Sequence, residues 1–320
     1  MSVADNTVLE KNQDMPEVVT KPKKRGRLGH TFKDIGIAWL FFFPFFSLFI
    51  VFTILPVVIA IYLSFTNFTV LQEPIWVGLS NYIELLTADN EFIKAMENTF
   101  AFAICSGPIS YLASFIFAWV IDGLKFKNVF SLAFYAPSLC SGIAMGSIWL
   151  VFFANDSTGH LNNLLLKLGW INSPVLWTQT ASYILPIVTV VSVWMGMGNQ
   201  FLGFLSGFQG LDRQVFESGA IDGVKNKYQE MIYLILPMMK PMLLYGAINT
   251  ITGSLGIFDI VVTIAGFPGP DLAGLTIAGH LNDYAFTRFD MGYASAIAVI
   301  LFAITFILGR VVFKVLGSKD

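Results

Sequence analysis

One polar segment, residues 206–240, separates two long apolar runs, and its centre reads Glu217-Ser218-Gly219-Ala220-Ile221-Asp222-Gly223-Val224. Residues 214–221 are expected to form a short helix that ends at Asp222-Gly223, because glycine readily adopts the left-handed conformation that stops a helix. Residues 225–236 are expected to form a second helix. Pro237 and Pro241 end or bend it, since proline lacks an N–H group. The segment therefore predicts a helical hairpin.

The composition is that of a membrane protein. The 320 residues are 55% hydrophobic and 12% charged, whereas about 25% of the residues of a soluble protein are charged. Six apolar runs each reach the length of about 20 residues that a membrane-spanning helix needs. They cover residues 37–65, 99–121, 129–153, 181–205, 242–265 and 293–315. Because backbone groups cannot stay unpaired in lipid, we predict an all-α polytopic fold with six transmembrane helices in one domain, residues 31–320.

Basic residues set the orientation. The polar tail, residues 1–30, ends in Lys21-Pro22-Lys23-Lys24-Arg25-Gly26-Arg27 and is predicted to be disordered. Its basic cluster either binds nucleic acid or anionic lipid or, as we favour, marks the cytoplasmic side of the first span. Of the 19 Lys and Arg residues, all but Lys94, Lys167 and Arg288 then lie on the cytoplasmic side. Both termini and the hairpin are therefore predicted to be cytoplasmic.

Three interpretations of the hairpin are open from its residues alone. It is a plain connector, a docking element for a soluble partner, or a pair of catalytic carboxylates. A docking helix would present an apolar face, and Phe216, Ala220, Val224 and Tyr228 recur at every fourth position. Catalysis is disfavoured, because Glu217 and Asp222 are five residues apart and have no His, Ser or Cys nucleophile beside them.

The hairpin also carries a family pattern. Its elements are Glu217-Ser218-Gly219, Asp222-Gly223-Val224, Tyr228 and Leu236-Pro237. They resemble the EAA loop of the permease subunits of ABC importers, which reads Glu-Ala-Ala, two residues, Asp-Gly-Ala, an aromatic-containing helix and Leu-Pro. The chain departs from that pattern at Ser218, Gly219 and Val224 and has one extra residue before Pro237. The stretches 205–211, 258–259 and 289–296 extend the similarity to permeases of the maltose type and their glycerol-3-phosphate relatives.

The resemblance implies a type I ABC importer fold in a bacterial plasma membrane. It also implies that Glu217, Ala220, Asp222 and Gly223 form or shape the contact with the ATP-hydrolysing subunit. The partners it implies are a second, different permease subunit, an ATP-binding subunit dimer and an extracytoplasmic sugar-binding protein, besides membrane lipid. ATP would be bound by the partner subunit. The chain itself has no Gly-Lys pair and hence no phosphate-binding P-loop.

Other chemistry is not indicated. Cys105 and Cys140 both fall in apolar runs without nearby His partners, which favours neither a metal site nor a disulfide framework. No basic patch with interleaved aromatic residues suggests nucleic-acid binding. We therefore expect no catalytic residues, no metal and no cofactor in this chain.

Polar residues inside two spans indicate a pathway for solute. Asn249, Thr252, Gly256 and Asp259 share one face of a straight helix, where they serve either helix–helix contact or a pathway wall. In maltose-type permeases the sugar lies between the helices before and after the EAA loop. The resemblance thus implies the following pathway residues: Ser192, Met195, Gly196, Asn199, Asn249, Thr252, Gly253 and Gly256. A register one residue different would bring in Thr250, Ser254 and Ile257 instead.

The favoured function is thus a sugar-importing ABC permease without enzymatic activity of its own. Uncharged amides and hydroxyls suit a neutral di- or oligosaccharide, whereas glycerol-3-phosphate would need an Arg or Lys at membrane depth. An ion-coupled secondary transporter or channel is the rival class. Such proteins usually keep ionisable residues inside the membrane, and here only Asp259 comes near. A membrane enzyme lacks any plausible catalytic cluster.

Overall fold

The protein is represented by a computed structural model, which describes the backbone of residues 32–317 and the side chains of residues 39–317. The described elements are almost all helices, which confirms the predicted all-α class. The chain divides into two units, one up to Pro56 and one from Val57 onward. The tail predicted to be disordered, residues 1–30, lies outside the described residues.

One long apolar helical run occupies the described part of the first unit and continues to Leu63. It consists of α1 (Phe32–Phe49), the π-helical turn η1 (Ile50–Ile54) and α2 (Leu55–Leu63). The stretch Trp39–Leu63 has a mean hydropathy of 2.7 and is long enough to cross a membrane. Pro56 has no N–H to donate, and the wider turn lies directly before it, where the Leu55 N–H donates to the Ile50 carbonyl.

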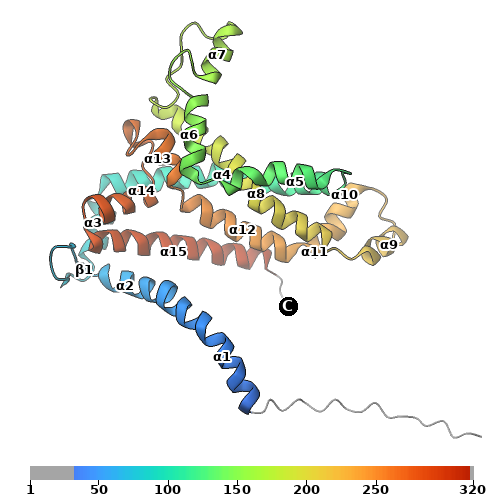
Figure 1. Ribbon diagram of the computed structural model, residues 1–320, viewed down its shortest axis with the longest axis horizontal. Coiled ribbons are helices and arrows are strands. Elements are labelled where there is room, and N and C mark those ends of the chain that lie inside the picture. Colours follow the sequence, from blue (N-terminus) through green and yellow to red (C-terminus); the bar gives the residue numbers. More distant parts are fainter. Residues whose placement is uncertain (1–31, 318–320) are drawn as a thin grey trace, which may run out of the picture. The chain divides into compact units, whose positions relative to one another are not determined.

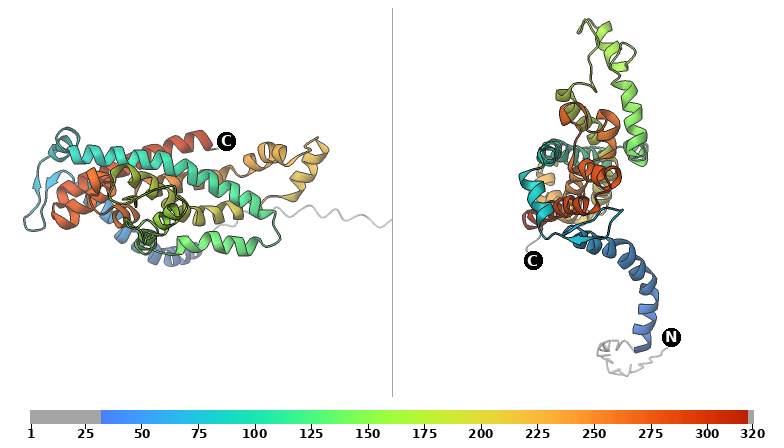
Figure 2. Two further views of the ribbon diagram at one scale, coloured as in Figure 1. Left: turned by 90° about the horizontal axis from the view of Figure 1, so that it is seen from above. Right: turned by 90° about the vertical axis from the view of Figure 1, so that its left-hand side faces the viewer.

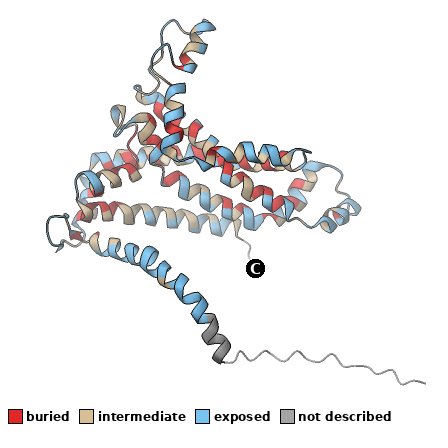
Figure 3. Ribbon diagram, in the orientation of Figure 1, coloured by how far each residue is buried: buried red, intermediate tan, exposed pale blue. Residues whose placement is uncertain are grey.

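Four long helices run alongside one another in the second unit (Figures 1 and 2). They are α4 (Asn90–Asp122), α8 (Ala181–Gln209), α12 (Lys240–Leu255) and α15 (Met291–Leu316). On α4, small buried residues stand at every fourth position: Ser106, Ser110, Ser114 and Ala118. Small residues let membrane helices approach closely. Figure 3 shows buried positions gathered where α4, α8 and α12 face one another.

The predicted span over residues 129–153 is bent, and a second bend lies just before the predicted span over residues 242–265. Within the described residues, four helices are long and apolar enough to cross a membrane, and six spans result if each of two bent helix pairs counts as one. In one pair, α5 (Lys127–Tyr135) and the 3-10 turn η2 (Ala136–Leu139) meet α6 (Gly142–Phe152) at 100°. Pro137 lies in η2, and Ser141 caps α6 by accepting a hydrogen bond from the Ala144 N–H at 3.2 Å. The other bend, of 76°, lies between the helical stretch Lys227–Met238 and α12.

The prediction of one continuous helix over residues 242–265 is wrong. α12 ends at Leu255, Gly256 follows as its cap, and α13 (Asp259–Ala265) is a separate helix. The Phe258 backbone, with φ −143° and ψ −68°, is not helical. Asp259 therefore does not continue the face that carries Asn249. Instead α13 packs against α6, where a Cβ on Gly146 would lie only 2.7 Å from the Thr263 Cβ.

A single buried asparagine organises the loop between α6 and α8, which contains α7 (His160–Lys167). The Asn162 amide nitrogen donates to the carbonyls of Ala154, Asp156 and Val175 at 3.0–3.1 Å. Its oxygen accepts from the Val175 N–H at 3.0 Å and from the Trp177 indole at 2.9 Å. The Asn162 side chain thus supplies hydrogen-bond partners to backbone groups of the loop that are not paired in a helix or sheet.

Replacing Asn162 with Ala should open this loop, because several buried polar groups would lose their partner at once. We expect local opening to become easier by about 2 kcal/mol or more, which is about 30-fold faster amide exchange over residues 154–178. Hydrogen–deuterium exchange measures this. Asn163→Ala is the matched control, since that side chain makes one hydrogen bond, to the Ser157 carbonyl at 3.3 Å. Equal exchange in the two variants would contradict the assignment.

The end of the unit that bears α3 and α14 is built from short elements around a partly buried carboxylate. The elements are the antiparallel strands β1 (Thr66–Asn67) and β2 (Ile75–Trp76), α3 (Ser80–Thr87), η4 (Pro270–Leu272), α14 (Ile277–Asn282) and η5 (Asp283–Thr287). Asp89 caps α4 by accepting from the Phe92 N–H at 2.8 Å. Its other oxygen accepts from His280 Nε2 and from the Tyr293 hydroxyl, each at 2.9 Å. Burial raises the pKa of Asp89, but these hydrogen bonds outweigh it and hold the pKa below its ordinary value.

Candidate functional site

A half-open cavity of about 540 Å³ lies between α4, α8 and α12. Its size falls in the range of small-molecule binding sites, about 300–1,000 Å³. The lining residues are Phe102, Ser106, Ser110, Ser192, Val193, Gly196, Asn199, Gln200, Gly203, Phe204, Met242, Tyr245, Gly246, Asn249, Thr250, Gly253, Ser254 and Ile257. Amides, hydroxyls, glycines and apolar groups make up this wall. Among the described residues that form it, there is no carboxylate, ammonium, guanidinium or imidazole group.

Five of the eight pathway residues that the sequence suggested line this cavity: Ser192, Gly196, Asn199, Asn249 and Gly253. The other three, Met195, Thr252 and Gly256, do not. Met195 packs against the apolar cluster around Val191, and the Thr252 hydroxyl donates to the Ile248 carbonyl at 3.0 Å. On α12 the wall also includes Thr250 and Ser254, with Ile257 just beyond the helix. These are the residues of the alternative register.

Hydrogen bonds join α8 to α12 at the cavity wall. The Gln200 amide donates to the Thr250 hydroxyl at 2.6 Å and to the Gly246 carbonyl at 3.1 Å. Gly246 is needed at this crossing, because a Cβ there would lie 2.8 Å from the Phe204 ring. Gln200 was not among the predicted pathway residues, although an amide in an apolar span is a recognisable signal.

The second candidate site is the hairpin, which consists of α9 (Arg213–Ile221), α10 (Lys227–Glu230), the π-helical turn η3 (Met231–Ile235) and α11 (Leu236–Met238). Asp212 caps α9 by accepting from the Gln214 N–H at 2.9 Å. α9 ends at Ile221, and Gly223 has φ +99°. The Val224 N–H then donates to the Gly219 carbonyl at 2.9 Å. This confirms the predicted helix and its stop at Asp222-Gly223.

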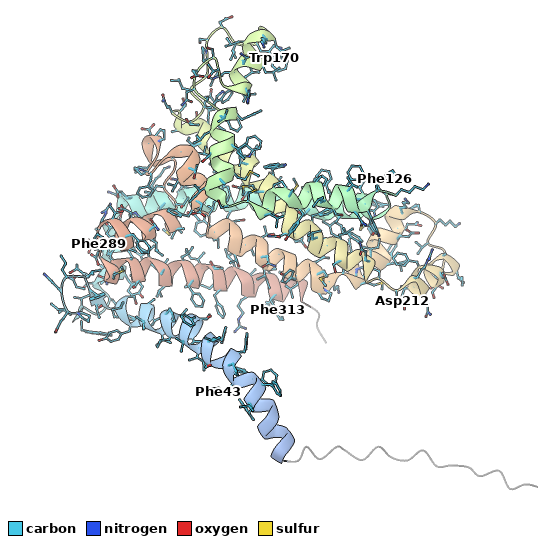
Figure 4. All side chains as sticks on the ribbon, in the orientation of Figure 1. Phe43, Phe126, Trp170, Asp212, Phe289 and Phe313 are labelled. Carbon is cyan, nitrogen blue, oxygen red and sulfur yellow. The ribbon has the colours of Figure 1, made fainter. Side chains whose placement is uncertain are left out.

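All four predicted coupling residues lie on the exposed surface of the hairpin: Glu217, Ala220, Asp222 and Gly223. Beside them Ile221 is 86% exposed, which is unusual for a large apolar side chain on a polar segment. Figure 4 labels Asp212 here, at the end of the helix bundle opposite Phe289. The arrangement suits a contact with another protein.

The apolar repeat of Phe216, Ala220, Val224 and Tyr228, which favoured the docking interpretation, does not lie on one helix. Because α9 stops at Ile221, Val224 and Tyr228 do not extend it. Phe216 and Val224 are half-buried, whereas Tyr228 is exposed. Gly219 is buried, and a Cβ there would lie 2.7 Å from a Leu234 methyl carbon. An alanine here, as in the family pattern, would require the Leu234 side chain to shift.

Metal-binding clusters were not expected from the sequence. In residues 39–317 no group of three or more His, Cys, Asp or Glu side chains is placed to hold a metal ion. Cys105 and Cys140 are both free and exposed. Neither cysteine lines the cavity.

Comparison with known protein families identifies the family to which the chain belongs. Residues 108–318, more than half of the chain, match the family described as binding-protein-dependent transport system inner membrane component. The chain belongs to this family. It is a membrane-embedded ABC transporter permease, and the cavity and hairpin are parts of a transport subunit.

Named relatives of the permease agree with this assignment. The probable ABC transporter permease protein YesP of Bacillus subtilis is 30% identical over 285 residues, which cover 88% of this permease and 91% of the relative. The arabinooligosaccharides transport system permease protein AraP of Halalkalibacterium halodurans is 30% identical over 304 residues, which cover 93% of each chain. The lactose transport system permease protein LacF of Rhizobium radiobacter is 27% identical and covers 82% of this permease and 88% of the relative.

A solved structure shares the fold. The permease aligns with a chain from the crystal structure of a bacterial alginate ABC transporter in complex with an alginate pentasaccharide-bound periplasmic protein. The TM-score is 0.74 at 18% identity, and the alignment covers 89% of this permease and 96% of that chain. The helical arrangement is therefore that of an ABC transporter chain.

Proposed function

We propose that this permease imports neutral di- or oligosaccharides and that the cavity between α4, α8 and α12 forms part of the translocation pathway. The observation that carries the proposal is the uncharged polar lining of this cavity. Sugar hydroxyls are matched by the amides of Asn199, Gln200 and Asn249 and by neighbouring serine and threonine hydroxyls. A polyol phosphate would need a basic residue on the wall.

The names of the relatives support a saccharide. Two are named for arabinooligosaccharides and lactose. The structural neighbour carries alginate, an acidic polysaccharide. A uronic acid polymer would also favour basic partners, and none is present among the described residues that line the cavity. Neutral sugars are therefore the preferred class.

The proposed topology has six spans, both termini in the cytoplasm, and a bacterial plasma membrane around them. Figure 4 supports part of this, because Phe126, in the basic link between α4 and α5, lies at the same end of the bundle as Asp212. Phe289, beside Arg288, lies at the opposite end. The positive-inside rule then makes the Asp212 end cytoplasmic.

Coupling to ATP hydrolysis would run through the hairpin. Exposed Glu217, Ala220, Asp222 and Gly223 would dock onto a separate ATP-binding subunit. The far side of the hairpin is firmly seated, since Met231 and Ile235 pack in one apolar cluster with Phe204 of α8. Phe204 also lines the cavity. A displacement of the hairpin is therefore passed through packed side chains to the pathway wall.

The complete transporter would contain further protein subunits besides this permease. We propose a second, different permease subunit, a dimer of ATP-binding subunits and an extracytoplasmic sugar-binding protein. The ATP-binding subunits would bind the ATP, so no cofactor is assigned to this chain. The neighbouring alginate transporter was solved with its periplasmic protein, which supports the last of these partners.

Uptake by the reconstituted complex tests the proposal. Proteoliposomes containing the permease and its co-purified partners should accumulate one or more of maltose, lactose and arabinotriose, and only when ATP and the ATP-binding subunit are present. Excess glycerol-3-phosphate should not compete. Uptake driven by an ion gradient without the ATP-binding subunit would support the secondary-transporter class and overturn the proposal.

A further inference from the structure

The third wall of the cavity is formed by α4. Unlike α8 and α12, this helix does not directly precede or follow the hairpin in the sequence. Ser106 and Ser110 lie on this wall. α4 closely approaches both neighbours here: a Cβ on Gly196 of α8 would lie 3.3 Å from the Ser110 hydroxyl. A Cβ on Gly107 would lie 3.5 Å from the Ser254 hydroxyl of α12. The wall is therefore formed by three helices in mutual contact.

The hydroxyl of Ser106 is buried without a partner. The residue is 4% exposed, and its Oγ makes no hydrogen bond within the described residues. Helical serines in apolar surroundings usually donate to the carbonyl four residues earlier. Ser114 on the same face of α4 does this at 2.7 Å, and so does Ser254 on α12. Ser106 thus differs from Ser114 and Ser254, whose hydroxyls are paired.

A second hydroxyl on the same cavity is also unpaired. Ser192 of α8 lines the cavity, and its Oγ likewise has no hydrogen-bond partner within the described residues. Leaving a buried polar group unpaired is costly, so such groups point to a ligand or a bound water. A hydroxyl both donates and accepts hydrogen bonds, which is what recognition of another hydroxyl requires.

We propose that Ser106 of α4, together with Ser192 of α8, binds a hydroxyl group of the sugar in the cavity. The inference rests on the proposed sugar-import function and extends it to a helix that the family resemblance did not suggest. Ser106 contributes a neutral hydrogen bond and no charge. It therefore acts on affinity and on discrimination among neutral saccharides.

Kinetics of Ser106→Ala test this in the full reconstituted complex. With maltose, lactose or arabinotriose, whichever the wild type imports, KM should rise about 2- to 10-fold, the effect of one hydrogen bond, with little change in kcat. The melting temperature should not fall, because the substitution removes an unpaired buried hydroxyl. Ser114→Ala is the matched control: it removes a paired hydroxyl that does not line the cavity and should leave KM unchanged.

An unchanged KM in Ser106→Ala would overturn the inference, as would an equal rise in Ser114→Ala. If the wild-type complex imports none of the sugars, the proposed function is overturned as well. If the wild type imports sugar and only the effect of Ser106→Ala is missing, the inference about Ser106 alone fails. Protection from alkylation adds a readout that a structural role would not move. In Ser106→Cys with Cys105 and Cys140 replaced by Ser, the imported sugar should slow labelling by N-ethylmaleimide. As the control, a protein that keeps Ser106 and Cys105, with only Cys140 replaced by Ser, should label equally with and without sugar, because Cys105 is exposed and outside the cavity.

Discussion

Glu217→Lys should lower ATP-driven sugar uptake about 10-fold or more in the reconstituted complex. Glu217 is exposed on α9 and makes no side-chain hydrogen bond or ion pair within the described residues. The substitution therefore leaves the fold and the melting temperature unchanged. Its effect comes from placing a positive charge where the ATP-binding subunit is proposed to receive a negative one. Initial uptake rates and ATP hydrolysis, measured on the same proteoliposomes, show the loss of coupling.

The neighbouring Ser218→Ala is the matched control for this variant. Ser218 is also exposed on α9, its hydroxyl donates to the Gln214 carbonyl at 2.9 Å, and the family pattern has alanine at this position. Its uptake should match the wild type. Normal uptake in Glu217→Lys would show that the hairpin does not couple through this carboxylate.

Asp89→Ala should lower the stability of the permease by about 3 kcal/mol or more, because it removes a helix cap and leaves two buried donors unpaired. The carboxylate joins α4, α14 and α15 through the Phe92 N–H, His280 and Tyr293. Thermal unfolding in detergent measures the effect. Glu91→Gln, in the same turn, is the control. The Glu91 ion pair with Arg288 is exposed and 3.4 Å long, so its loss should cost less than about 1 kcal/mol.

The acid dependence of stability should follow from the same carboxylate. Because its pKa in the folded protein is held below the ordinary value of 3.8, the Asp89 contribution is fully present above that value. It is lost as the pH falls through the folded pKa. The melting temperature of the wild type should therefore fall faster below pH 3.8 than that of Asp89→Asn. Parallel curves for the two proteins would contradict this assignment.

Local sequence signals predicted the hairpin well. The stop of α9 depends on Asp222-Gly223 alone, and the structure has that helix end with Gly223 at positive φ. Five of the pathway residues that the family resemblance implied on α8 and α12 line the cavity, and three of them, Ser192, Asn199 and Asn249, are polar residues in apolar helices. The straight span over residues 242–265 failed because hydropathy does not sense the break at Gly256 and Phe258.

Contacts between distant parts of the chain could not be predicted from one sequence. Asp89 and His280 are 191 positions apart, and neither lies in a recognisable motif. The role of Asn162 depends on carbonyls that only the folded loop brings together. The serines of α4 were visible at every fourth position. Their membership in the cavity, however, depends on how α4 packs against α8 and α12.

The most direct test of the central claim is the accessibility of a cysteine placed at Ala220 in the exposed hairpin, with Cys105 and Cys140 replaced by Ser. A membrane-impermeant maleimide should label Ala220→Cys in inside-out vesicles stripped of the ATP-binding subunit and should label it much more slowly once that subunit is bound. Intact cells should remain unlabelled at this position. Labelling from the outside of intact cells, or equal labelling with and without the ATP-binding subunit, would contradict the account.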